Sequence, residues 1–199
     1  MSMIIPLSKQ DLENTIAFWQ GKITADYQLM EAAYFAIYTE FDKFLNAALL
    51  HYVLGGKTAD DRTIALRLNF KDNTHFKNVV GGGSNKFEIN VLERFHNTQT
   101  SAKIWVELFS PQDDPFTKAI YYHTNFRNNS KVMRFLRNYI AHKSPEAKQT
   151  YVISNLNNKA FIEPYDYLKE AFTGYTQPKY DFFIEIMQEF CDLILKPIS

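Results

Sequence analysis

The stretch ADYQLMEAAYFAIYTEFDKFLNAALLHYVL, residues 25–54, decides the fold. Its apolar residues recur every three or four positions, so they would form one continuous stripe along a helix. The stripe consists of Met30, Tyr34, Ile37, Phe41, Phe44, Leu45, Ala48, Leu49 and Tyr52. Gly55 and Gly56 come directly afterwards and indicate where the helix stops. We therefore predict a long helix with one buried face.

Helical patterns also dominate on both sides of this segment. Ser8 and Asp11 resemble a capping box that starts a first helix, and Gly21 is expected to end it. Two further helices are predicted over residues 86–109 and 179–195, where apolar residues again recur at helical spacing.

Two other stretches favour β structure. TIALRLNF (63–70) alternates apolar and polar residues, which is typical of a short strand. TYVIS (150–154) and AFIEP (160–164) flank a polar turn and could pair as a small hairpin. No repeat or linker interrupts the chain. We predict that residues 1–199 form a single all-α domain, a helical bundle with a small irregular or β-hairpin insertion.

The composition limits the possible classes of protein. The chain has 199 residues, of which 46% are hydrophobic, so a substantial core is expected and disorder is not. Its single cysteine, Cys191, excludes an internal disulfide. Neither a signal peptide nor a membrane-spanning apolar run is visible in the sequence. We expect a cytoplasmic protein without a membrane anchor.

Positive charge is concentrated in one part of a neutral chain. The formal net charge is zero, yet residues 118–148 contain seven Lys and Arg residues against a single acidic residue, Glu146. The basic residues are Lys118, Arg127, Lys131, Arg134, Arg137, Lys143 and Lys148. Because arginine offers paired donors to phosphate oxygens, this segment is suited to bind phosphate groups.

The segment RFLRNYIAHKSPEA (134–147) lies within this basic region, on a helix predicted over 131–143. Asn129 or Ser130 is expected to cap the start of that helix. Ser144 is a good N-cap and Pro145 a good first residue, so a new helix is expected to begin directly afterwards.

Arg137 and His142 are the two candidate catalytic residues of this helix. They are five positions apart, so their side chains differ by roughly 140° around the axis and could flank a shared groove. The C-terminal end of a helix favours positive charge, and a histidine there can serve as acid or base. Basic side chains at a helix end are also common in ordinary structural helices, and that interpretation stays open.

RNYIAH (137–142) resembles the signature of the HEPN superfamily, an arginine and a histidine separated by four to six residues. Asn138 matches the polar residue that commonly follows the arginine. The family places this motif on a late helix of an all-α bundle, after a long early helix. The resemblance is specific over about a dozen residues and implies an HEPN-like bundle for this chain.

The resemblance also implies a chemistry. Many HEPN proteins are metal-independent endoribonucleases of toxin or phage-defence type, in which the 2′-hydroxyl of the RNA attacks the adjacent phosphate. By analogy His142 would be the acid or base, Arg137 the phosphate clamp and Asn138 an orienting partner. The basic residues predicted to contact phosphate or RNA are Arg127, Lys131, Arg134 and Lys143.

Other features of the family are matched only in part. Some HEPN nucleases use an upstream acidic residue, for which Glu40 and Asp42 are candidates, and one toxin group carries a tyrosine where this chain has Ser144. The resemblance further implies a homodimer, an RNA substrate and a possible antitoxin or other protein partner. No metal or other cofactor is expected, because the histidines lack zinc-ligand spacing.

Three alternatives remain open at this point. The chain is a ribonuclease, a non-catalytic HEPN module that dimerises or binds RNA, or a structural helical protein. In the last case Arg137 and His142 would pair with the chain's own carboxylates.

Overall fold

The computed structural model describes residues 4–26, 29–81, 108–110 and 113–196. Within these ranges the chain is helical, and its β features are isolated bridges such as Leu66–Phe109. The predicted all-α class is therefore confirmed for the described residues. The helix predicted over 86–109 falls almost entirely outside them.

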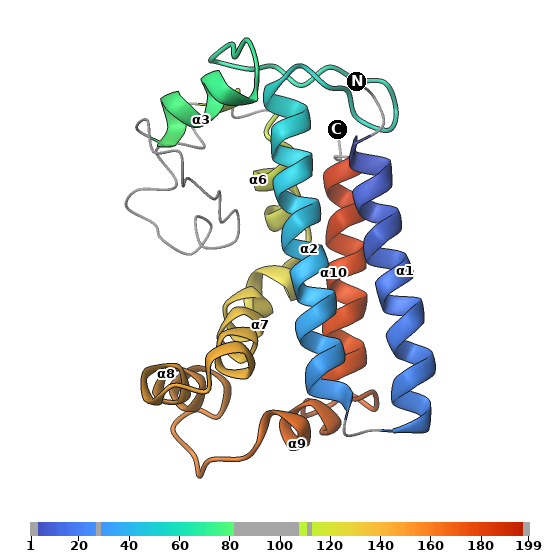
Figure 1. Cartoon of the computed structure of the whole chain (residues 1–199), viewed down its shortest axis with the longest axis vertical. Helices are drawn as coiled ribbons and strands as arrows, with labels where there is room; N and C mark the ends of the chain where they lie inside the picture. Colours follow the sequence, from blue (N-terminus) through green and yellow to red (C-terminus); the bar gives the residue numbers. More distant parts are fainter. Residues whose placement is uncertain (1–3, 27–28, 82–107, 111–112, 197–199) are drawn as a thin grey trace. The chain divides into compact units, whose positions relative to one another are not determined.

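The helices carry the labels of Figure 1. They are α1 (Ile4–Ala25), α2 (Met30–Val53), α3 (Asn73–Gly81), α6 (Pro115–Tyr122), α7 (Thr124–His142), α8 (Pro145–Asn155), α9 (Pro164–Lys169) and α10 (Lys179–Leu195). None of them is long and apolar enough to cross a membrane, as far as the described residues go.

The chain divides into two compact units. Unit 1 consists of Met1–Lys9, Asp42–His123 and Phe190–Ser199. Unit 2 consists of Gln10–Phe41 and Thr124–Glu189 and therefore contains α7, α8 and α9. The predicted organisation as one domain stays a prediction.

Helix α2 confirms the prediction made from residues 25–54. Every residue of its apolar stripe is buried, with exposed fractions of at most 3%. Burying a large apolar side chain contributes roughly 1.5–3 kcal/mol, so this stripe alone accounts for a large part of the core. The helix ends at Val53, and Gly55 lies just beyond with φ 84°, a left-handed conformation that favours glycine.

The first and last helices of the chain differ in how well their predicted bounds agree with the structure. Helix α10 has the predicted bounds. Helix α1 runs from Ile4 to Ala25, so Ser8 is not its cap and Gly21 does not end it. An isolated glycine is tolerated inside a helix when residues beyond it stay in the core, and Ile23 is only 7% exposed.

The predicted hairpin at 150–164 is wrong, because TYVIS belongs to helix α8. The Ser144 hydroxyl accepts a hydrogen bond from the Ala147 amide at 3.2 Å, and Pro145 is the first helical residue. This cap commits the chain to a helix that buries Tyr151. Local β preference is overridden by the cap and by this packing. The strand predicted over 63–70 is likewise absent and leaves single bridges.

Unit 2 holds α7 between two partners. On one flank the Tyr34 hydroxyl of α2 donates to the Met133 carbonyl at 3.0 Å. On the other, α8 lies beside α7 (Figure 1), and the Asn155 side-chain amide donates to the Val132 carbonyl at 2.9 Å. The rings of Tyr139 and Tyr151 stack at 5.2 Å between the two helices. Helix α7 is therefore fixed along two of its sides.

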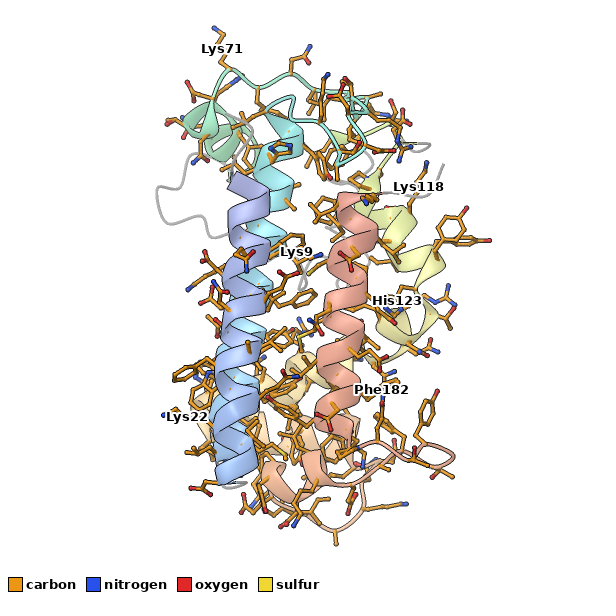
Figure 2. The ribbon with its side chains drawn as sticks, turned by 90° about the vertical axis from the view of Figure 1, so that its right-hand side faces the viewer. Lys9, Lys22, Lys71, Lys118, His123 and Phe182 are labelled. Carbon is orange, nitrogen blue, oxygen red and sulfur yellow. The ribbon has the colours of Figure 1, made fainter. Side chains whose placement is uncertain are left out.

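Unit 1 also contains a tyrosine–carbonyl hydrogen bond and a contact between aromatic rings. The Tyr52 hydroxyl donates to the Ile194 carbonyl at 2.7 Å. His123 is buried and lies beside α10 (Figure 2). Its ring is 6.4 Å from the ring of Phe190 on that helix.

Candidate functional site

Helix α7 begins earlier than predicted. It starts at Thr124, so Asn129 and Ser130 lie inside the helix and do not cap it. Their side chains bond to backbone carbonyls within the helix instead, Asn129 to that of Asn125 at 2.9 Å. The apolar face extends upstream to the buried Phe126, which explains why the helix continues past the predicted start.

The end of α7 matches the predicted geometry closely. His142 is the last helical residue, and Lys143 comes next with φ 49°. The Lys143 amide donates to the Tyr139 carbonyl at 2.9 Å. Ser144 and Pro145 then start α8 as predicted. The motif therefore ends at a tight corner between two helices.

Arg137 is a half-buried side chain held in two ways. Its Nη1 donates to the Asn138 side-chain oxygen at 3.1 Å, and its guanidinium carbon lies 5.4 Å from the ring centroid of Phe35 on α2. A purely structural role would favour a salt bridge from Arg137 to a carboxylate. No such salt bridge is present in the described ranges. Its buried Nε finds no hydrogen-bond acceptor among the described residues. A buried unpaired donor costs free energy, and an anion bound nearby could relieve that cost.

His142 differs from Arg137 in its surroundings. Its side chain is exposed and makes no hydrogen bond or ion pair with any described residue. Arg137 lies on the flank of α7 that contacts α2, whereas His142 lies about 140° around the helix axis. The chain thus brings the two residues to the same end of one helix, but on different sides of it.

The predicted phosphate contacts fall into two groups. Arg127, Lys131 and Arg134 lie on α7 itself, which contains no acidic residue. Lys143 lies beyond its end and pairs with Glu31 of α2, at 2.9 Å between Nζ and Oε2. Its ammonium group is thus shared with a carboxylate, and its role as an RNA contact stays a prediction.

Glu31 is a residue that the sequence did not single out. Its second oxygen, Oε1, accepts a hydrogen bond from the Tyr165 amide in the first turn of α9, at 3.1 Å. One carboxylate therefore connects the start of α2, the corner after His142 and the start of α9. In the sequence Glu31 is an ordinary acid in the first turn of a helix, and a contact 112 positions away leaves no local signal.

The acidic partners proposed from the sequence remain predictions. Glu40 and Asp42 both lie on α2, as Glu31 does, but Glu40 belongs to unit 2 and Asp42 to unit 1. Tyr121 and Tyr122 are exposed and belong to unit 1.

The described residues offer no group of three or more His, Cys, Asp or Glu side chains that could hold a metal ion. Comparisons with models of known protein families, with curated proteins and with solved structures found no match.

Proposed function

We propose that this protein is a metal-independent endoribonuclease of the HEPN kind, in which Arg137, Asn138 and His142 act on an RNA phosphodiester. The observation that carries the proposal is the end of α7, where an exposed histidine follows a braced arginine on a helix without acidic residues. Acid or base catalysis needs a histidine that substrate can reach, and charge stabilisation needs a donor that is already oriented.

The proposed reaction uses the RNA's own nucleophile. The 2′-oxygen bonds to phosphorus while the bond from phosphorus to the 5′-oxygen breaks, which leaves a 2′,3′-cyclic phosphate and a free 5′-hydroxyl. His142 accepts the proton of the 2′-hydroxyl or donates one to the departing 5′-oxygen. Arg137 donates to the non-bridging oxygens, on which negative charge grows, and Asn138 keeps its guanidinium in place.

A second copy of the chain completes the site in this proposal. The reaction has two proton transfers, and the motif of one chain holds one histidine. A homodimer in which two α7 ends line one cleft would supply both, and would bring an arginine of one copy near the histidine of the other. A toxin or defence role, with an antitoxin or other protein partner, belongs to the same proposal.

The test is a cleavage assay without metal. Purified wild type, Arg137→Ala and His142→Ala would be incubated with end-labelled RNAs in EDTA. We expect wild type and the control Lys71→Ala to cleave, to leave cyclic phosphate ends, and to spare RNA with a single 2′-deoxy substitution at the cut site, and we expect Arg137→Ala and His142→Ala not to cleave. Lys71→Ala, an exposed residue of unit 1, serves as the control for loss of one positive charge. Intact RNA with wild type, or cleavage by Arg137→Ala and His142→Ala equal to that of wild type, would overturn the proposal.

A non-catalytic HEPN module that dimerises or binds RNA is the second candidate. It is favoured by the burial of Arg137 against Phe35 on a different side of α7 from His142. In that case the wild type would bind RNA or self-associate without cleaving, and neither alanine variant would change the RNA.

A further inference from the structure

One face of α7 carries basic residues along most of the helix. Arg127, Lys131, Arg134, Asn138 and His142 are spaced at steps of four, three, four and four, which places them on one side. Arg127, Lys131 and His142 are exposed, and the other two are half-buried. We call this side the basic face of α7.

The contacts that hold α7 against α2 and α8 lie on other sides of the helix, and Arg127, Lys131 and His142 of the basic face are exposed. Contacts with α2 use Phe126, Met133 and Arg137, and contacts with α8 use Val132 and Tyr139. All five lie on other sides of the helix. Helix α7 itself contains no acidic residue, and a basic helix in a chain of zero net charge attracts a polyanion electrostatically.

Phe135 borders the basic face with an aromatic ring. The ring is half-buried, and two cations lie over it: Lys131 Nζ at 5.6 Å and Arg134 Cζ at 4.8 Å from its centroid. Unpaired nucleic-acid bases stack on aromatic rings and on arginine guanidinium planes, while the flanking phosphates are met by basic side chains. Phe135 and its two neighbours offer both kinds of contact at one position.

We propose that the basic face of α7 binds single-stranded RNA, with one unpaired base stacked on Phe135 and the neighbouring phosphates on Lys131 and Arg134. The face spans about 22 Å from Arg127 to His142, long enough for several nucleotides. A duplex keeps its bases stacked inside, so a ring on a helix surface cannot reach their flat sides. This inference rests on the proposed function and specifies its substrate as an unpaired stretch of RNA.

Helix α1 provides a matched control within the same unit. Phe18 is 57% exposed, and Lys22, four residues later, lies 5.3 Å from its ring centroid. The spacing equals that of Lys131 and Phe135, but α1 also carries Asp11 and Glu13. If any exposed ring with a cation sufficed, Phe18 would bind RNA as well as Phe135 does.

The test measures binding separately from cleavage. A 2′-O-methyl RNA strand cannot be cleaved, and its affinity for the full-length protein would be measured by fluorescence anisotropy, alone and annealed to its complement. We expect wild type to prefer the single strand, Phe135→Leu to weaken that binding about fivefold or more, and Phe135→Trp to restore it. Phe18→Leu should bind as wild type does. Circular dichroism of each variant checks that α7 is intact.

A second measurement locates the stacked base. Strands with one abasic position each would be tested in turn. For wild type, an abasic site at one particular position should weaken binding. For Phe135→Leu, an abasic site at that position should cause no further loss of affinity. Equal profiles for both proteins, or equal affinity of Phe135→Leu and wild type, would overturn the inference.

The two proposals fail in different ways. If only the stacking inference is wrong, RNA with 2′-hydroxyls is still cut in a manner that depends on His142, and Phe135→Leu cuts as well as wild type. If only the ribonuclease proposal is wrong, no RNA is cut, yet binding still depends on Phe135.

Discussion

Two long helices of this protein carry a histidine in their last turn, and the two histidines have opposite surroundings. His51 of α2 hydrogen-bonds through Nε2 to the Lys57 carbonyl at 2.8 Å, and its ring lies 5.3 Å from that of Tyr52. His142 of α7 is exposed and has no such bond in the described ranges.

The residues directly after each helix explain the difference. After α2, Gly55 adopts φ 84° and the chain folds back, so that the Lys57 carbonyl reaches the imidazole. After α7, Ser144 caps a new helix and the chain leads away from His142. A helix-terminal histidine is thus fixed or left accessible by the few residues behind it. His51 serves the fold, and His142 is available to a ligand.

The largest expected effect separates the two histidines by function. His142→Ala should lower the rate of RNA cleavage by about 10²–10⁴-fold, the usual contribution of a general acid or base. His51→Ala should leave the rate near that of wild type and lower the melting temperature instead. Rates under single-turnover conditions and thermal unfolding of both variants make the comparison. Equal loss of activity in both would remove the distinction.

A smaller effect tests how tightly His51 is enclosed. A Cβ at Gly56 would lie 2.2 Å from His51 Nε2, so Gly56→Ala must displace the ring and break its bond to Lys57. The ring can move aside, so we expect to lose about 0.5–1.5 kcal/mol of unfolding free energy, the usual net contribution of one hydrogen bond. Denaturant unfolding measures it.

Gly21→Ala is the matched control for that variant. Its new Cβ would meet nothing within 4 Å inside helix α1, so it should stabilise the protein by about 0.5–1 kcal/mol.

Combining His51→Ala with Gly56→Ala removes the clash, so the double variant should lose less than the two single losses added together. Simple additivity would contradict the enclosure of His51.

Next in size is the contact that holds the corner behind His142. Glu31→Gln removes the charge that pairs with Lys143 but keeps an oxygen for the Tyr165 amide. We expect a loss of roughly 1 kcal/mol or less, because the pair is partly exposed. Combining Glu31→Gln with Lys143→Gln in a double-mutant cycle isolates the pair. The coupling should shrink at high salt, and a coupling of zero at low salt would contradict it.

The smallest effect concerns pH and the unit that contains His51. The Asp114 carboxylate caps α6, accepting hydrogen bonds from the Phe116 and Thr117 amides at 2.9 and 3.2 Å. Burial raises the pKa of Asp114 above its ordinary value, more than these bonds lower it. The folded protein therefore binds this proton more tightly than the unfolded chain, and the contribution of Asp114 to stability falls as pH rises through that range.

Asp114→Asn retains an acceptor for the cap and cannot ionise. At neutral pH it should match or slightly exceed the stability of wild type. As pH falls toward the ordinary aspartate value of about 4, wild type should gain relative to the variant. Melting temperatures of both proteins from pH 7 to 4 measure this difference, and a gain in the opposite direction would contradict the role of burial.

Local signals predicted the parts of this fold that depend on neighbouring residues. The stripe of α2, the bounds of α10 and the start of α8 at Ser144 and Pro145 all arise from short-range patterns. The hairpin was mispredicted because Tyr151 was assigned by strand preference, whereas the cap and the core decide its helix.

In the candidate site, too, local sequence predicted some features and long-range packing decides the others. The RNYIAH motif places Arg137, Asn138 and His142 at one helix end, as the sequence predicts. Neither the contact of Arg137 with Phe35 nor the role of Glu31 could be predicted, since both join residues about a hundred positions apart. Such contacts depend on how helices pack.

Only Lys143 and Ser144 separate the last residue of α7 from the first residue of α8. A two-residue link allows little independent movement, and both of its residues are held in place. Lys143 forms a salt bridge with Glu31, and the Ser144 hydroxyl accepts a hydrogen bond from the Ala147 amide. His142 therefore cannot swing on a loop of its own, and it changes position only when the whole corner moves. Amide hydrogen exchange should show Lys143 and Ala147 opening together, at one shared rate, as a hinge between two rigid arms.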